Sequence, residues 1–337
     1  MALLSVRDLV TEFRLSDRTF RAVDGVSLEL EPGETLGLVG ESGCGKSMTL
    51  RSIIRVLPRR AVVLSGSVSY NGKDITAISD ERMARIRGRE IAMVLQDPMT
   101  ALNPVLTVGH QLLETLRETR NITGRRARER SLELLRLVGV PDPSRRLHSY
   151  PHELSGGMAQ RVVIAVALAA EPRILLADEP TTALDVTIQA QILRLLVDLQ
   201  RRLEMSVVLV THDLSVVAQT CRRVMVMYAG RVVEEGSAAE IFSHPRHPYT
   251  VGLMKCLPRL DAPLSSANLY SIPGSPPDLT NLPSGCRFHP RCPLAIDECR
   301  RSDVPLLEVA LNHRAACIRH QYLAEHDLPS ISSDVPA

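Results

Sequence analysis

A glycine-rich loop near the N-terminus has the clearest chemistry in the sequence. Its eight residues are Gly40, Glu41, Ser42, Gly43, Cys44, Gly45, Lys46 and Ser47. Glycines at this spacing let backbone N–H groups approach phosphates, and a helix N-terminus after the loop favours negative charge. We expect Lys46 to reach the β- and γ-phosphates of a nucleotide, the Ser47 hydroxyl to bind Mg²⁺, and Met48 to complete the loop. Cys44 occupies a variable position of the motif and is interpreted as space-filling.

A second group of candidate residues lies at the ends of apolar runs farther along the chain. Asp178 ends one such run, where its carboxylate can hold Mg²⁺ through water. Glu179 follows directly, where a carboxylate can polarise an attacking water molecule. Gln96 ends another run and can join Mg²⁺ or water at the same site. His212 and Asp185 have two interpretations each: a polar contact that senses the γ-phosphate, or an ordinary surface residue.

A serine and two glycines form another surface suited to phosphates. Ser155, Gly156 and Gly157 open an expected helix, and backbone N–H groups at such a helix start attract anions. One chain does not need two phosphate-binding surfaces for one nucleotide. Two chains that face each other do, so the pattern predicts a dimer that clamps a nucleotide at its interface.

Short apolar runs and alternating patterns predict the elements that position these residues. Strands are expected at residues 3–10, 24–30, 35–39, 62–70, 91–95, 173–178, 206–211 and 223–228. Helices are expected at residues 106–120, 126–138, 160–170 and 186–203. The alternation of strands and helices favours an α/β core with a mostly parallel sheet. We therefore expect one domain at residues 1–240, with a helical subdomain inserted at about 97–160, and a C-terminal region at 241–337.

The composition argues against several classes of protein. The net charge of the 337 residues is +2 and tryptophan is absent, so no basic surface or aromatic platform for nucleic acid is expected. The longest purely apolar run, residues 162–170, is far shorter than the roughly 20 residues of a membrane-spanning helix. The first residues lack a signal-peptide pattern. We therefore expect a soluble chain that reaches a membrane only through a partner.

Four of the seven cysteines are concentrated near the C-terminus, at Cys286, Cys292, Cys299 and Cys317. Thiols stay reduced in the cytosol, so such a cluster indicates a metal site before a disulfide framework. The tight cysteine pairs of structural zinc sites are missing here, whereas the ligand spacing of [4Fe–4S] sites varies. An iron–sulfur cluster with a structural or regulatory role is the leading interpretation. Zinc, free thiols and disulfides are the alternatives.

Taken together, and in their order along the chain, the motifs resemble the ATPases of ABC transporters over roughly residues 3–240. The family implies a RecA-like parallel-sheet core, N-terminal antiparallel strands and, after them, a small irregular cysteine-rich C-terminal domain. It also implies a head-to-tail dimer, in which Ser155 and Gly157 of one chain contact the ATP held by Lys46 of the other. Met158 stands where a common form of the signature has glutamine, which leaves the serine and the glycines in place.

The resemblance also implies an aromatic side chain that stacks on adenine. Phe13 is the choice by position and Phe20 is the alternative, although either ring could simply pack in the core. The loop formed by Ala183, Leu184 and Asp185 matches the family as well. ATP and Mg²⁺ are therefore the expected cofactors, beside the expected iron–sulfur cluster.

Three further segments resemble the peptide-transporter branch of this family: residues 96–104, 247–250 and 272–277. This branch implies an ATP-hydrolysing subunit that powers import of dipeptides or oligopeptides at the cytoplasmic face of the bacterial inner membrane. The implied partners are a second, related ATPase subunit (or a second copy of this chain), two membrane permease subunits and an extracytoplasmic solute-binding protein. The branch also favours iron–sulfur over zinc.

Other functions stay open at this point. The same motor could import nickel, glutathione or an oligosaccharide, because the solute contacts belong to other subunits. A soluble ABC ATPase acting on DNA or ribosomes is a less favoured alternative, since such proteins usually have two cassettes, long coiled coils or a basic surface. A redox or iron sensor built on the cysteine tail is a third alternative.

Overall fold

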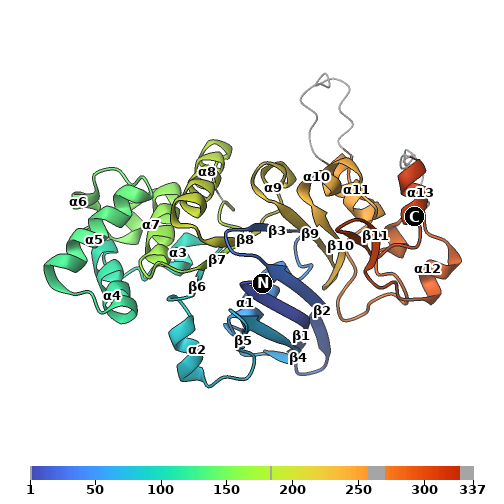
Figure 1. Cartoon of the computed structure of the whole chain (residues 1–337), viewed down its shortest axis with the longest axis horizontal. Helices are drawn as coiled ribbons and strands as arrows, with labels where there is room; N and C mark the ends of the chain where they lie inside the picture. The colour runs from blue at the N-terminus through green and yellow to red at the C-terminus, as the bar shows by residue number, and fades with distance from the viewer. Residues whose placement is uncertain (1, 183, 257–269, 327–337) are drawn as a thin grey trace. The chain divides into compact units, whose positions relative to one another are not determined.

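The computed structural model describes residues 2–182, 184–256 and 270–326 (Figure 1). The chain divides into two compact units, each built from several segments. The first unit contains Met1–Ser5, Glu29–Thr35 and Ser67–Val210, and the second contains Val6–Leu28, Leu36–Gly66 and Thr211–Ala337. The candidate site residues are therefore divided between the two units.

Three parallel strands form the core of the first unit. They are β6 (Ile91–Val94), β7 (Ile174–Asp178) and β8 (Ser206–Val210), with β7 in the middle. Every residue of β7 and β8 is buried, as expected for parallel strands that are covered on both faces. The expected parallel sheet is confirmed. Because β7 ends at Asp178, the apolar run brings a carboxylate to the edge where ligands of such sheets bind.

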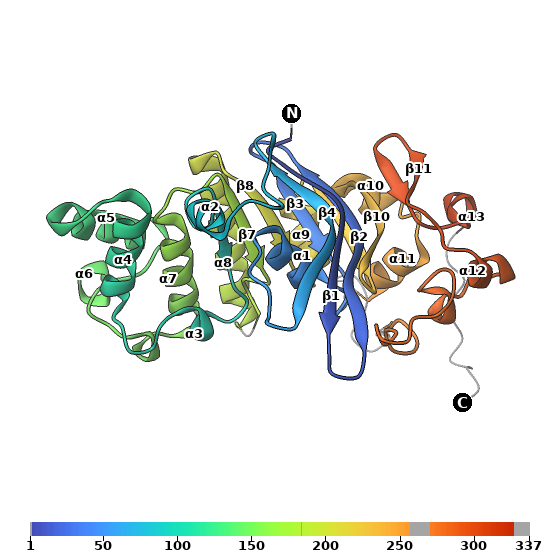
Figure 2. The same cartoon turned by 90° about the horizontal axis from the view of Figure 1, so that it is seen from below.

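Helices fill most of the first unit between β6 and β7. The helices of this unit are α2 (Asp80–Ile86), α3 (Pro98–Ala101), α4 (Val108–Arg120), α5 (Gly124–Leu137), α6 (Pro143–Arg146), η1 (Pro151–Glu153), α7 (Gly156–Leu168) and α8 (Val186–Leu203). α4, α5 and α7 pack against one another, as Figure 1 and Figure 2 show. α4 begins after Thr107, whose side chain accepts a hydrogen bond from the His110 N–H (3.2 Å). This arrangement is the inserted helical part of the expected fold class.

The second unit is rich in strands. It contains most of β1 (Leu4–Arg14) and β2 (Thr19–Leu30), part of β4 (Ala61–Tyr70), and β3 (Thr35–Val39), β9 (Arg223–Tyr228), β10 (Arg231–Ser237), β11 (Leu307–Ala310) and β12 (His313–Ala315). β3 pairs parallel to β9, with Leu36 opposite Arg223, and β10 pairs antiparallel to β9. β1 lies between β2 and β4 (Figure 2). Of the remaining strands, the two-residue β5 (Lys73–Asp74) belongs to the first unit.

The helices of the second unit are short. They are α1 (Lys46–Ile53), α9 (Leu214–Thr220), α10 (Ala238–Ser243), α11 (Pro248–Lys255), η2 (His289–Arg291), α12 (Asp297–Arg301) and α13 (His320–Glu325). Within the described part of the chain, every helix of the protein is too short or too polar to span a bilayer.

The C-terminal segment is joined to the sheet of the second unit, which its sequence did not indicate. β11 and β12 form a hairpin, and β12 pairs with β10, with Glu234 opposite Ala315. The fully buried carboxylate of Glu234 also accepts a hydrogen bond from His313 Nε2 (2.7 Å). Strands of three or four residues carry too few alternations for a periodic signal.

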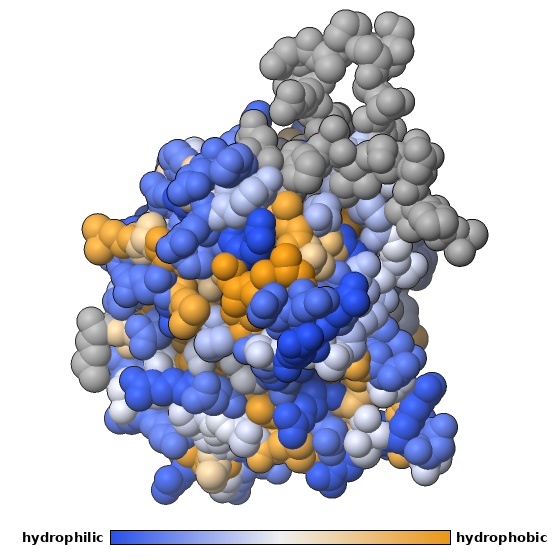
Figure 3. Space-filling model, turned by 90° about the vertical axis from the view of Figure 1, so that its right-hand side faces the viewer, coloured by the Kyte–Doolittle hydropathy of each residue, from blue (hydrophilic) through white to orange (hydrophobic). Residues whose placement is uncertain are grey.

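The face of the molecule in Figure 3 shows apolar patches between hydrophilic side chains.

Candidate nucleotide-binding site

The glycine-rich loop connects β3 to α1 in the second unit, the strand-to-helix context expected for a phosphate loop. Gly40 (φ 151°) and Gly45 (φ 110°) have backbone angles that other residues rarely adopt. A Cβ atom on Gly40 would lie 2.3 Å from the Met227 carbonyl oxygen, and one on Gly45 would lie 2.3 Å from that of Ala22. Only glycine fits at either position, so the loop packs closely on two neighbouring strands while its N–H groups remain at a helix start.

Lys46 lies inside this loop. Its side chain is 4% exposed, and its Nζ donates hydrogen bonds to the carbonyl oxygens of Gly40 (2.7 Å) and Glu41 (3.0 Å). These carbonyl groups are partners that an ammonium group can exchange for phosphate oxygens. Cys44 is buried, and burial raises the pKa of its thiol. A buried neutral thiol agrees with the space-filling interpretation of Cys44.

Gln96 and Glu179 lie together in the first unit, although 83 positions separate them in the sequence. Gln96 Nε2 donates a hydrogen bond to Glu179 Oε2 (3.2 Å), and the Thr182 hydroxyl donates to the same oxygen (2.8 Å). Glu179 has a left-handed backbone (φ 45°), and its N–H donates to the Val210 carbonyl oxygen (3.0 Å). Such strained backbone is found preferentially at functional sites. The carboxylate is thus directed by two donors, directly after the buried Asp178.

Thr182 was not anticipated from the sequence. A threonine three residues after a glutamate carries no signal of its own, because the contact depends on the left-handed turn at Glu179. Asp185, by contrast, has an identifiable local role. Its side chain accepts a hydrogen bond from the Ile188 N–H (3.0 Å) and caps α8. The expected contact of Asp185 with a γ-phosphate stays a prediction, and its neighbour Ala183 lies outside the described residues.

The serine–glycine surface lies at the start of α7. Ser155 is the N-cap residue, and its hydroxyl accepts a hydrogen bond from the Met158 N–H (3.4 Å). Ser155 and Gly156 are exposed. A Cβ atom on Gly157 would lie 2.7 Å from Ile188 Cγ2, so this glycine allows α7 to approach α8 closely. The first turn of α7 therefore presents an accessible hydroxyl and free N–H groups, as an anion-binding helix start requires.

The remaining candidates lie on the second unit. His212 is exposed and follows β8 in the chain, so its expected role stays a prediction. The rings of Phe13 and Phe20 stack on each other, with centroids 5.1 Å apart and planes inclined by 8°. Both rings are partly exposed. The choice between Phe13 and Phe20 for adenine stacking therefore also stays a prediction.

The prediction of a metal cluster at the C-terminal cysteines is wrong. Across residues 2–182, 184–256 and 270–326, no group of three or more His, Cys, Asp or Glu side chains is arranged to hold a metal ion. This finding overturns both the iron–sulfur interpretation and the zinc alternative for Cys286, Cys292, Cys299 and Cys317. All four residues are free cysteines.

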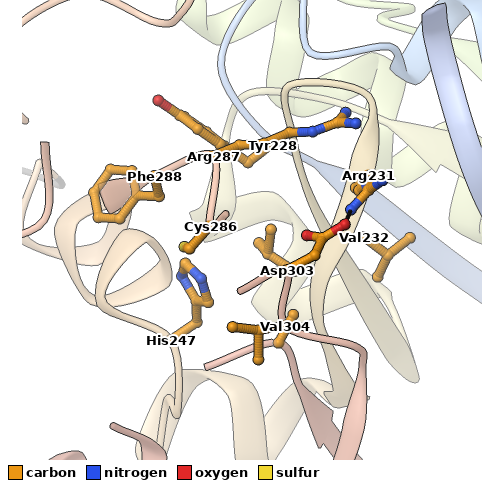
Figure 4. A pocket seen from close by; sticks show the side chains of 11 residues that line it. Tyr228, Arg231, Val232, His247, Cys286, Arg287, Phe288, Asp303 and Val304 are labelled. Atoms are coloured by element: carbon orange, nitrogen blue, oxygen red, sulfur yellow. Dashed lines mark hydrogen bonds and ion pairs between the residues drawn. The ribbon is translucent and has the colours of Figure 1, made fainter. Parts of the chain in front are cut away.

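The physical reason is the environment of these thiols. All four side chains line a cavity of about 10 Å³, together with apolar groups such as Phe288 and Leu294. Cys286 also borders a second cavity of about 40 Å³, where it faces His247 (Figure 4). Burial raises the pKa of the Cys292 thiol and that of the Cys317 thiol to about 12. Thiols bind metals as thiolates, and burial disfavours the thiolates of Cys292 and Cys317.

We predict that alkylation will distinguish these thiols from Cys256. A rise of the pKa from 9.0 to about 12 lowers the thiolate fraction of Cys292 and Cys317 about a thousandfold at pH 8. Burial also raises the pKa of the Cys256 thiol, but Cys256 is exposed, so iodoacetamide should modify it first. Peptide mass mapping over time measures the rates, and the urea-unfolded chain is the control in which they converge. Equal rates in the folded chain would contradict the buried cluster.

A phosphate loop between β3 and α1 in one unit, and in the other a buried parallel strand that ends in an aspartate followed by a glutamate, are the elements of a P-loop ATPase. The family model for ABC transporters matches residues 23–182, and the model for the oligopeptide/dipeptide transporter C-terminal region matches residues 233–299. The chain belongs to the ATP-binding proteins of ABC transporters of the peptide/dipeptide importer type. It is therefore an ABC-type ATPase, and the glycine cradle around Lys46 fits the ATP and Mg²⁺ that this family uses.

Relatives are similar over nearly the whole chain. A probable peptide ABC transporter ATP-binding protein, y4tR of Sinorhizobium fredii, is 51% identical over 94% of this chain and 95% of its own length. The dipeptide transport ATP-binding protein DppD of Bacillus subtilis is 51% identical over 96% of each chain.

Solved structures support the fold. A dimeric ATP-binding cassette, MJ0796, in a post-hydrolysis state bound to ADP and Pi is 30% identical, with a TM-score of 0.63, over 70% of this chain and 98% of that one. CbiO1 of Clostridium perfringens is 29% identical, with a TM-score of 0.61, over 72% of this chain and 91% of that one. The expected ABC fold class is confirmed, apart from its cysteine-rich C-terminal detail.

Proposed function

We propose that this chain is the ATP-hydrolysing subunit that powers import of dipeptides or oligopeptides through a membrane permease. The observation that carries the proposal is similarity to peptide-import ATP-binding proteins over both regions, including the peptide-transporter region at residues 233–299. These relatives favour peptides over nickel, glutathione or oligosaccharides. They also favour a transport subunit over a soluble ATPase or a redox sensor.

Each candidate residue has its own role in this proposal. Lys46 would exchange the carbonyl groups of its own loop for the β- and γ-phosphates, and Ser47 would hold Mg²⁺. Asp178 would hold Mg²⁺ through water. Glu179 polarises the attacking water, and the hydrogen bonds from Gln96 and Thr182 keep its carboxylate oriented.

We further propose that hydrolysis depends on two ATPase chains. Ser155 and Gly157 of one chain contact the triphosphate bound by Lys46 of the other, and closure of this dimer drives the permease. The second ATPase is a related subunit, with a second copy of this chain as the alternative. Two permease subunits and an extracytoplasmic solute-binding protein complete the system, and this chain is peripheral to the cytoplasmic face of the bacterial inner membrane. We keep 1–240 and 241–337 as its two functional regions.

Purification of the native membrane complex tests the proposal. Mass spectrometry should identify permease subunits and a second ATPase together with this chain. In proteoliposomes with the solute-binding protein, dipeptides or oligopeptides should stimulate ATP turnover, and the same complex carrying Glu179→Gln serves as the control for contaminating ATPases. Stimulation by nickel or an oligosaccharide and not by peptides would contradict peptide import but not the ATPase assignment.

A further inference from the structure

Glu41, the second residue of the phosphate loop, forms hydrogen bonds with three side chains. Its N–H donates a hydrogen bond to the Tyr249 hydroxyl (2.7 Å), and its carbonyl oxygen accepts one from Lys46 Nζ (3.0 Å). Its carboxylate accepts two hydrogen bonds from Arg291: from Nη1 to Oε2 (2.7 Å) and from Nη2 to Oε1 (3.0 Å). Paired hydrogen bonds of this kind fix direction as well as distance. The backbone and the side chain of Glu41 are therefore both fixed in place.

Two of these partners come from the C-terminal part of the chain. Tyr249 lies in α11, within segment 247–250. Arg291 ends η2, and its Nε donates a hydrogen bond to the carbonyl oxygen of Pro273 (2.8 Å), within segment 272–277. Both segments resemble the peptide-transporter branch, yet neither contains a residue proposed to contact the nucleotide, Mg²⁺ or the attacking water. They converge on a single residue of the phosphate loop.

The positions of Tyr249 and Arg291 are rigid. Tyr249 is fully buried, and its ring lies against Tyr228 (centroids 4.6 Å apart) and Phe288 (5.3 Å). The guanidinium of Arg291, with only 6% of the side chain exposed, lies over the same two rings. Figure 4 shows Tyr228 and Phe288 beside the neighbouring cavity. Packed aromatic rings therefore hold the hydroxyl and the guanidinium in the positions from which they contact Glu41.

His247 adds a further constraint. Its Nδ1 accepts a hydrogen bond from the Tyr249 N–H (3.1 Å), and complete burial lowers the pKa of the imidazole to about 3. The ring is therefore neutral at ordinary pH, which leaves Nδ1 available as an acceptor. His247 thus sets the start of α11 and, through it, the position of the Tyr249 hydroxyl.

Nucleotide binding affects these three side-chain partners of Glu41 differently. Lys46 has to leave the Glu41 carbonyl oxygen when it binds phosphate. The Tyr249 contact uses the Glu41 N–H and the Arg291 contacts use its carboxylate, so neither depends on the Lys46 ammonium group and both can persist. They would keep the loop in the same shape while Lys46 exchanges carbonyl oxygens for phosphate oxygens. A loop that is already ordered loses less conformational entropy when a ligand binds.

We propose that Tyr249 and Arg291 are positioning residues that preorganise the phosphate loop for ATP. The C-terminal region of this chain is then a structural part of the nucleotide site and not a separate appendage. Neither residue touches the nucleotide, so their loss should weaken ATP binding and leave the chemical step nearly unchanged. The proposal goes beyond peptide import, because it does not depend on the transported solute.

Variants of the full-length chain test this role through binding of a fluorescent ATP analogue with Mg²⁺. Tyr249→Phe removes one hydroxyl and keeps the packed ring, and we expect its Kd to rise about fivefold, which corresponds to one neutral hydrogen bond. Arg291→Lys keeps the charge but loses the paired geometry, and we expect a rise of about tenfold. In both variants kcat at saturating ATP should stay within about twofold of the wild-type value.

A double-mutant cycle tests whether Arg291 acts through Glu41. Glu41→Gln should weaken binding in the wild-type background but add little to Arg291→Lys, because the two changes remove the same contact. Additive effects would show that Arg291 influences ATP binding by another route, and the proposal for Arg291 would then be wrong.

Two matched controls separate positioning from general loss of stability. Arg287→Lys changes a similarly buried arginine four positions before Arg291, whose partners are Asp24 and the Ala229 carbonyl oxygen and not Glu41. Tyr70→Phe removes a hydroxyl that donates to Glu90 (2.7 Å) in the other unit. Both controls should bind ATP within about twofold of the wild type. Unchanged affinity in folded Tyr249→Phe and Arg291→Lys chains, or equal losses in the controls, would overturn the proposal.

Discussion

Replacing Glu179 by glutamine should leave ATP binding intact and lower ATP turnover by roughly 10²–10⁴-fold. Glutamine keeps the size of the side chain and an oxygen that can accept the hydrogen bonds from Gln96 and Thr182. It removes the negative charge that polarises the attacking water. Phosphate release at steady state measures the loss, and binding of a fluorescent ATP analogue with Mg²⁺ measures what is retained.

Glu171→Gln is the matched control for this experiment. Glu171 is an exposed glutamate of the same unit that pairs with Arg120 (3.0 Å) and Arg130 (2.9 Å). Exposed ion pairs contribute about 0–1 kcal/mol, so this change should alter neither binding nor turnover appreciably. Near-normal turnover in Glu179→Gln would refute the assignment of Glu179 as the group that activates water.

The second large effect is expected when Ser155 is replaced by alanine. In the Glu179→Gln background, ATP with Mg²⁺ should trap closed dimers of ATPase chains. Each hydrogen bond from a Ser155 hydroxyl to a phosphate contributes about 1.5–3 kcal/mol. The dimer dissociation constant should therefore rise on the order of 10–10²-fold with a related partner ATPase, where one such bond is lost, and on the order of 10²–10⁴-fold for two copies of this chain, where two are lost. Analytical ultracentrifugation of the chain, alone and with its partner ATPase, measures this constant.

Ser79→Ala controls for the capping role of Ser155. Both serines are exposed N-cap residues of the first unit, and each accepts a hydrogen bond at 3.4 Å from the N–H three residues later. Loss of either cap should cost about 1 kcal/mol of stability. Only Ser155→Ala should weaken the dimer while ATP binding to the single chain persists. A dimer that forms equally well in both variants would disprove contact between Ser155 and the nucleotide of the other chain.

Local patterns were sufficient to predict the phosphate loop and the strands of the core. The loop needs glycine at fixed spacing because neighbouring carbonyl groups leave no room for a Cβ atom at Gly40 or Gly45. Buried parallel strands read as continuous apolar runs, so β7 and β8 were placed to within a residue or two. Asp178 could be located in the same way, because it ends such a run.

Contacts between distant segments could not be predicted in this way. The pairing of Gln96 with Glu179 and the hydrogen bond from Thr182 depend on how β6 and β7 lie side by side and on a left-handed turn. The prediction of a metal cluster at the C-terminal cysteines is wrong for a related reason. All four thiols line one cavity, but whether thiols bind a metal depends on their geometry and on the polarity around them.

The amino-acid sequence by itself determined the class of this protein, because phosphate loops, helix caps and buried strands depend on residues close together in the chain. The tertiary structure alone decided which side chains support those motifs. The hydrogen bonds that link Tyr249 and Arg291 to Glu41 join residues more than 200 positions apart. No local pattern encodes such a contact, since it exists only after the C-terminal segment has packed beside the loop. Burial, which keeps the Cys292 thiol and the His247 ring neutral, likewise arises only from the folded chain.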